Sequence, residues 1–239
     1  MERIPTGIEE LDEIIKGGYP KGKLLLITGT PGAGKTIYGI HLLHKSCNSG
    51  KKCTLIATEE TPQDILMQAE VLGLELKSYV DSGNLIIERV FESRTESVEQ
   101  ADQFGTGLDI MEIGILERVK MVPEDTDVVV IDNLGVYALD IATKDFRNLI
   151  DTINRILTNK GITTLIIMDE TANELTHNVA EYSAYSSMKI MIKDNPYTSL
   201  RERYLDIIKM RSTHISLELS LFDITSKGIR FSILKRNVF

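Results

Sequence analysis

Apolar residues along this chain follow two alternating periods. Uninterrupted apolar runs, which are typical of buried strands, occupy residues 22–29, 52–60, 84–90, 126–133 and 162–170. Apolar residues spaced three or four apart, which are typical of helices, occupy residues 36–50, 61–73, 108–121 and 144–161. Thr61 is suited to cap the second of these helices, Pro62 fits its first turn, and Asp64 suits the positive end of its dipole.

This alternation predicts an α/β fold with a mainly parallel, twisted sheet flanked by helices. Strand patterns at 203–211 and 219–234, the latter with a turn at 226–228, predict antiparallel strands at the C-terminal end. Residues 92–107 are polar and predict a loop. A chain of 239 residues can bury one full hydrophobic core, so we expect a single domain over 1–239.

The composition is that of an ordinary globular protein, with 42% apolar and 26% charged residues. No apolar run approaches the roughly 18 residues that span a bilayer, and the acidic, proline-containing start does not resemble a signal peptide. We therefore expect a cytoplasmic protein without a membrane partner. His41, His44 and Cys47 lie three apart on a predicted helix and spread over a wide arc, which favours packing over metal binding.

A net charge of −8 opposes binding to nucleic acid and to anionic membranes. The exception is the C-terminal segment, where four basic residues follow the last acid, Asp223: Lys227, Arg230, Lys235 and Arg236. This segment is either a DNA-binding patch or, as we favour, an edge strand protected by its charges.

The sequence GTPGAGKT, residues 29–36, matches the phosphate-loop pattern G-x-x-x-x-G-K-[ST] in full. Chance would produce such a match in roughly one of a hundred chains of this length. Here it lies between a predicted strand and a predicted helix, where glycines allow N–H groups to face phosphate oxygens. The alternative is a glycine-rich turn without a ligand. We expect the nucleotide to be bound by Thr30, Pro31, Gly32, Ala33, Gly34, Lys35 and Thr36.

Within this loop, Lys35 is expected to contact the β- and γ-phosphates and Thr36 to ligate Mg²⁺. Asp132 ends a buried strand at the same sheet edge, where it holds Mg²⁺ through water or else caps a turn. Glu59 and Glu60 end another strand there. Because adjacent strand residues face opposite sides, we expect Glu59 to be the base that deprotonates water and Glu60 to support it. The alternative is that both are surface charges.

With these motifs in order, the chain resembles the RecA-like ATPases, in particular single-domain relatives of KaiC and RadA. IPTGIEELDEIIKGGYPKG is similar to that family's N-terminal signature, GTPGAGKT to its P-loop, and TEETPQDI to its paired-glutamate segment. VVVIDN is similar to its second nucleotide motif, and KMR with the later FDITSKGI to its C-terminal segment. The resemblance covers nearly the whole chain and implies a RecA-like P-loop NTPase core that binds ATP.

The resemblance also implies a homo-oligomer, commonly a hexameric ring, with the nucleotide between subunits. Lys209 and Arg211 would then contact the γ-phosphate in the neighbouring subunit's site, as an arginine finger in trans. They lie two apart on a predicted strand and therefore on one face. The alternative is a solvated pair bridged to acids such as Asp206.

Two segments depart from the family pattern. Ser212 stands where the family usually has Gly after KMR, and His214 comes one place early, so no role is transferred to this histidine. Tyr182 and Tyr185 stand in place of the His and Asp of an EH…AD segment, so no role in subunit contacts is transferred to residues 181–187.

The two loops that bind single-stranded DNA in RecA-type recombinases contain no Lys or Arg here. Residues 133–143 contain one acid, and residues 169–187 contain four. Because DNA binding needs cations, we favour a ring ATPase with slow hydrolysis that changes partner binding. The alternatives are a RadA-like recombination accessory protein that binds DNA and a nucleotide-holding assembly module of a motility machine.

Overall fold

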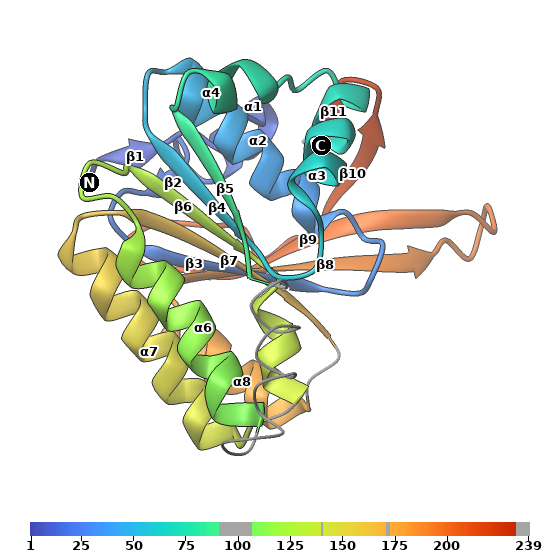
Figure 1. Ribbon diagram of the computed structural model, residues 1–239. Helices are drawn as coiled ribbons and strands as arrows, with labels where there is room; N and C mark the ends of the chain where they lie inside the picture. Colours follow the sequence, from blue (N-terminus) through green and yellow to red (C-terminus); the bar gives the residue numbers. More distant parts are fainter. Residues whose placement is uncertain (91–106, 140, 171–172, 233–239) are drawn as a thin grey trace.

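A mixed sheet of nine strands runs through the part of the chain that the structure describes, in the order β11-β10-β9-β8-β3-β7-β6-β4-β5 (Figure 1). The computed structural model describes residues 1–90, 107–139, 141–170 and 173–232. The strands are β3 (Leu24–Gly29), β4 (Cys53–Ala57), β5 (Leu85–Arg89), β6 (Val128–Asp132), β7 (Thr163–Asp169), β8 (Ser186–Asp194), β9 (Arg201–Met210), β10 (Ser220–Thr225) and β11 (Gly228–Phe231).

Neighbouring strands from β5 across to β8 are parallel, and those from β8 to β11 are antiparallel. This confirms the predicted α/β architecture. A separate two-stranded sheet joins β1 (Arg3–Ile4) to β2 (Tyr19–Pro20) near the N-terminus.

Helices cover both faces of the large sheet (Figure 1). One face carries α1 (Glu9–Ile14), α2 (Lys35–Asn48), α3 (Pro62–Val71) and α4 (Lys77–Asp81). The other carries α6 (Gly107–Met121), the short 3₁₀ helix η1 (Leu134–Leu139), α7 (Thr143–Asn159) and α8 (Glu174–Ser183). None of the described helices is both long and apolar enough to cross a membrane.

Adjacent residues of the buried strands pack into opposite cores. In β3, Leu25 and Ile27 join the apolar cluster that includes α2, whereas Leu24 and Leu26 join the cluster that includes α7. Each fully buried side chain of this size stabilises the fold by about 1.5–3 kcal/mol. Because both faces are covered, every strand position favours an apolar residue, which explains the uninterrupted runs.

The local signals around α3 are confirmed. Pro62 occupies the first turn, and the Thr61 hydroxyl accepts a hydrogen bond from the Asp64 N–H at 3.1 Å. This bond satisfies one of the N–H groups that a helix leaves unpaired at its start.

The apolar pattern did not predict β8, although this strand lies inside the sheet between β3 and β9. Its first residues, Ser186 and Ser187, are polar yet buried, so the strand has no uninterrupted apolar run. The two segments expected to be loops after β6 and β7 contain η1 and α8. The predicted polar loop lies outside the described residues except for Gly107, at which α6 begins.

His41 on α2 joins the two ends of the described chain. Its Nδ1 lies 3.2 Å from the Gly7 carbonyl, and its Nε2 accepts a hydrogen bond from the Ile229 N–H at 2.9 Å. The second bond makes Nε2 the acceptor, so Nδ1 carries the proton and donates to Gly7. The side chain is 4% exposed, and burial lowers its pKa to about 4.

The protein should therefore lose stability as the pH falls from about 6.5 toward 4. His41 stays neutral in the folded protein down to about pH 4, whereas in the unfolded chain it takes up a proton near pH 6.5. Its contribution to the free energy of unfolding is therefore fully present above pH 6.5 and is lost as the pH falls toward 4. The full loss is about 3 kcal/mol. Urea unfolding across this range should show a flatter pH dependence for His41→Gln than for the wild type. His214→Gln, at an exposed site, is the control, and equal slopes for all three proteins would contradict the assignment.

Candidate functional site

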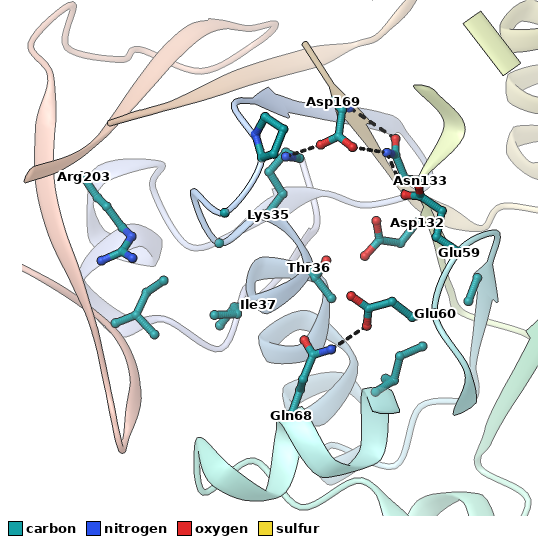
Figure 2. Close-up of a pocket in the computed structure, with 16 residues that line it drawn as sticks. Lys35, Thr36, Ile37, Glu59, Glu60, Gln68, Asp132, Asn133, Asp169 and Arg203 are labelled. Atoms are coloured by element: carbon teal, nitrogen blue, oxygen red, sulfur yellow. Dashed lines mark hydrogen bonds and ion pairs between the residues drawn. The ribbon is translucent and has the colours of Figure 1, made fainter. Parts of the chain in front are cut away.

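The predicted phosphate loop lies between the end of β3 and the start of α2. Gly32 and Gly34 adopt φ angles of 76° and 103°, in the left-handed region that glycine tolerates. Ala33 is buried beneath the loop, and Thr30 contributes its carbonyl, which accepts a hydrogen bond from Lys35 at 3.0 Å. The other predicted loop residues line a cavity of about 540 Å³ (Figure 2): Pro31, Gly32, Gly34, Lys35 and Thr36.

Asp132, at the carboxyl end of β6, lines the same cavity. Thr36, in the first turn of α2, lines the cavity beside it. Burial raises the pKa of Asp132 to about 7, and the nearby Thr36 hydroxyl opposes this rise. A cation bound at this carboxylate would favour its charged form, so Thr36 and Asp132 together suit a divalent metal.

Glu59 and Glu60 both line the cavity. The strand that was expected to end with this pair is shorter than predicted: β4 ends at Ala57, so the rule of alternating strand faces does not apply to the two glutamates. Gln68 of α3 donates to Glu60 Oε2 at 2.6 Å, and burial raises the pKa of Glu60. Figure 2 shows Glu60 beside Thr36 and Glu59 closer to Asn133.

Asn133 and Asp169 belong to the same cavity, and the motif reasoning did not identify them. Asp169 ends β7 and forms an ion pair with Lys35. The Asn133 amide nitrogen donates to Glu59 Oε2 at 3.1 Å and to Asp169 Oδ2 at 2.5 Å. The available signal was that Asp169 ends an apolar run, as Asp132 does.

Arg203 of β9 and Ile224 of β10 line the cavity from the antiparallel end of the sheet. The Arg203 guanidinium lies 3.5 Å from the Asp223 carboxylate. Figure 2 shows Arg203 on the side of the cavity opposite the acids. This brings a second cation to the cavity, from a residue that no sequence motif marked.

Lys209 and Arg211 do not line this cavity. Lys209 Nζ donates to the Tyr182 carbonyl at 3.2 Å, and burial, followed by the nearby charge of Arg211, lowers the pKa of Lys209. Arg211 lies one residue beyond β9, exposed, with its guanidinium 6.0 Å from the centre of the Tyr185 ring. Both cations therefore lie beside the end of α8 and away from the chain's own phosphate loop.

The two departures from the family pattern contact each other. The Tyr185 hydroxyl donates to Ser212 Oγ at 2.9 Å. Ser212 adopts a φ of 59°, the left-handed conformation that glycine favours. The backbone after KMR therefore has the conformation that a glycine at this position would favour. The Tyr185 ring, which stands where the family has Asp, lies beside Arg211.

The charged segments considered for DNA binding are largely paired or acidic. Glu170, after β7, forms an ion pair with Lys189 at 2.7 Å, and Arg230 of edge strand β11 lies 3.9 Å from Glu10. Lys235 and Arg236 lie outside the described residues. The described part of the C-terminal segment is thus an edge strand that carries charges.

The cavity suits a nucleotide bound with a metal ion. The loop and the first turn of α2 offer N–H donors and the positive end of a helix, and Lys35 adds a cation. The Thr30 hydroxyl is buried without a hydrogen-bond partner. Among the described residues, no group of three or more His, Cys, Asp or Glu side chains is arranged to hold a metal. Phosphate oxygens and water would therefore complete the shell begun by Thr36 and Asp132.

Comparison with known proteins agrees with this geometry. The model of the KaiC ATPase family matches residues 4–236. The chain belongs to the KaiC family of ATPases. A KaiC-like protein of Pyrococcus horikoshii OT3 has a similar solved structure, with a TM-score of 0.77 and 25% identity over 97% of this chain and 99% of that one.

The curated relatives of this chain differ in length. A UPF0273 protein of Thermotoga maritima is 27% identical over 96% of this chain and 95% of its own length. A circadian clock oscillator protein KaiC of Prochlorococcus marinus is 28% identical over 89% of this chain, but the match spans only 42% of the clock protein. The match thus spans nearly all of the first relative and less than half of the second.

We expect Gly34→Ala to disrupt phosphate binding more than folding. The residue would keep a φ near 103°, and its new Cβ would meet Ile224 Cδ1 at 2.6 Å. Gly50→Ala is a matched control, because Gly50 has a φ of 77° and open space around it. Denaturant unfolding should show a loss of about 1 kcal/mol for each variant. Calorimetric titration should show weaker nucleotide binding only for Gly34→Ala, and equal binding by both would contradict this account.

Proposed function

We propose that this KaiC-family protein binds ATP with Mg²⁺ in the cavity above α2 and hydrolyses it slowly. The observation that carries the proposal is that Lys35, Thr36 and Asp132 line one cavity at the N-terminus of α2. Lys35 would bind the β- and γ-phosphates, and Thr36 and Asp132 would hold Mg²⁺. The bound metal would supply charge neutralisation on the phosphates.

Glu59 is the proposed base and Glu60 its supporting acid. Glu59 would orient water for attack on the γ-phosphorus and accept its proton, while the bond from the γ-phosphorus to the bridging oxygen breaks to give ADP and phosphate. Asn133 holds the Glu59 carboxylate at 3.1 Å, and Gln68 holds that of Glu60 at 2.6 Å. Both acids therefore have a fixed neighbour within the cavity wall.

The proposal places Lys209 and Arg211 in the site of a neighbouring subunit. They lie away from their own cavity, beside Tyr182 and Tyr185, and Arg211 is exposed. A second subunit stacked against this side would bring both cations to a γ-phosphate, where they could stabilise the transition-state charge. We propose that the subunits form a closed homo-oligomer, a hexameric ring whose nucleotide state changes assembly or partner binding.

The acidic segments after β6 and β7 give little support to direct DNA binding. Glu170 and Lys189 already form an ion pair, and Arg230 lies near Glu10. The paired glutamates in the cavity wall favour hydrolysis over mere retention of nucleotide. We therefore keep the ring ATPase as the proposed function.

Glu59→Gln should retain ATP binding and lose hydrolysis by at least about a hundredfold, because the amide cannot accept the water proton. Glu60→Gln, which makes the same change one residue away, should lose less. Phosphate release measured alongside calorimetric binding would test both variants, with Lys35→Ala as the non-binding control. Turnover by Glu59→Gln equal to that of the wild type would remove Glu59 as the base.

Arg211→Ala should lower turnover by at least about a thousandfold while leaving ATP binding to an isolated subunit intact. A complementation experiment separates action in trans from action in cis. Lys35→Ala subunits cannot use their own site but still carry Arg211, whereas Arg211→Ala subunits have the reverse defect. Mixing the two should restore phosphate release if Arg211 acts on a neighbour.

Light scattering with Mg²⁺ and a non-hydrolysable ATP analogue should show that the two variants assemble together. Co-assembly without restored activity would contradict the assignment in trans. A monomer that binds nucleotide and releases no phosphate would instead favour a nucleotide-sensing module.

A further inference from the structure

The ammonium group of Lys35 is fully engaged within the protein. It donates to the Gly29 and Thr30 carbonyls, each at 3.0 Å, and forms an ion pair with Asp169. An ammonium has three protons, so these three partners match its capacity. The Lys35 side chain is 7% exposed and that of Asp169 is 21% exposed, so water screens their attraction only partly.

Asp169 is held firmly in this position. Its Oδ2 accepts a hydrogen bond from the Asn133 amide at 2.5 Å, and its backbone N–H donates to Asn133 Oδ1 at 3.2 Å. Asn133 is 4% exposed, and its Oδ1 also accepts from the Gly135 N–H at 2.8 Å. The Asp169 carboxylate therefore cannot move away from Lys35 without breaking its hydrogen bond with the buried Asn133 amide.

The strand order places this ion pair where phosphates must lie. Asp169 ends β7, between β3, which leads into the phosphate loop, and β6, which ends at Asp132. Figure 2 shows the Asp169 carboxylate directed at Lys35 and Asn133, within the cavity wall. A phosphate that reaches Lys35 therefore approaches a fixed negative charge.

We propose that Asp169 is an internal counter-ion that pairs with Lys35 in the nucleotide-free protein, and that this ion pair must be broken when the nucleotide's phosphates bind Lys35. This inference rests on the proposed nucleotide binding at the same site, and it adds a residue that sets the affinity for the nucleotide. Asn133 is the positioning residue, because it fixes the carboxylate. Breaking the Lys35–Asp169 pair and placing like charges close together both oppose binding.

Asp169 should consequently weaken binding of ligands whose phosphates contact Lys35. A triphosphate and a diphosphate would both be affected, and the triphosphate more, because it carries more negative charge and a γ-phosphate that would also contact Lys35. A nucleoside monophosphate, which has no β- or γ-phosphate, would be unaffected. Asp169 thereby lowers the affinity for ATP relative to a site with a neutral residue.

The experiment compares Asp169→Asn with the wild type in calorimetric titrations with Mg²⁺ and a non-hydrolysable ATP analogue, ADP or AMP. The matched control is Glu170→Gln, which removes the same charge from the next residue, whose partner is Lys189. Asp169→Asn should bind the analogue about tenfold more tightly, because binding no longer has to break the ion pair between Lys35 and Asp169. Glu170→Gln should bind it as the wild type does.

Thermal unfolding gives a second test, in which Asp169→Asn should lower the stability of the nucleotide-free protein although it strengthens binding of the analogue. Without nucleotide, Asp169→Asn should melt at a lower temperature than the wild type, because Lys35 stays buried without its anionic partner. With the analogue, its melting temperature should rise further than that of the wild type. A purely structural role for Asp169 would lower stability and weaken binding together. Asp169→Ser, which removes the charge with a smaller side chain, should repeat both results.

Equal or weaker analogue binding by both Asp169 variants, with normal binding by the wild type, would overturn this inference and leave the proposed function intact. Absence of analogue binding in the wild type and in both Asp169 variants would overturn the proposed function, and this inference with it. Tighter binding by the variants, with a larger effect for the analogue than for ADP and none for AMP, would support it.

Discussion

The candidate site depends on one geometric constraint, namely that parallel strands bring their carboxyl ends to the same edge of a sheet. The strands that supply it lie next to one another in the order β3, β7, β6 and β4. The phosphate loop follows β3, Asp169 ends β7, Asp132 ends β6, and Glu59 follows β4. Residues from distant parts of the chain thus meet because each follows a buried strand, as is general for ligand sites in open α/β sheets.

Burial of several charged side chains at this edge of the sheet changes their pKa values and their pairing. Asp132 and Glu60 have raised pKa values because burial disfavours their charged forms, and Lys35 is engaged by Asp169. Hydrogen bonds from Asn133 and Gln68 hold Glu59 and Glu60 in place before a ligand arrives, whereas Lys35 must first leave Asp169 in the binding that we propose. The KaiC-family fold supplies this arrangement, while the charges of Lys209 and Arg211 remain outside the cavity.

The sequence predicted the parallel part of the fold well because its strands are covered on both faces and are therefore uninterrupted apolar runs. It failed for β8, whose buried Ser186 and Ser187 give no such run. It also predicted too long a strand before the glutamate pair: β4 ends at Ala57, so the rule of alternating faces does not apply to Glu59 and Glu60. Asn133 was missed because an amide after a strand has no motif of its own.

By itself, the sequence determined what local chemistry can determine: the phosphate loop, the strand that ends at Asp132, the cap at Thr61 and the identity of the family. These follow from residue types at fixed spacing, which act within one turn or one strand. Only the tertiary structure decided which side chains share the cavity. The ion pair of Lys35 with Asp169, the bonds of Asn133, and the approach of Arg203 all depend on strand order, because they join residues far apart in the chain.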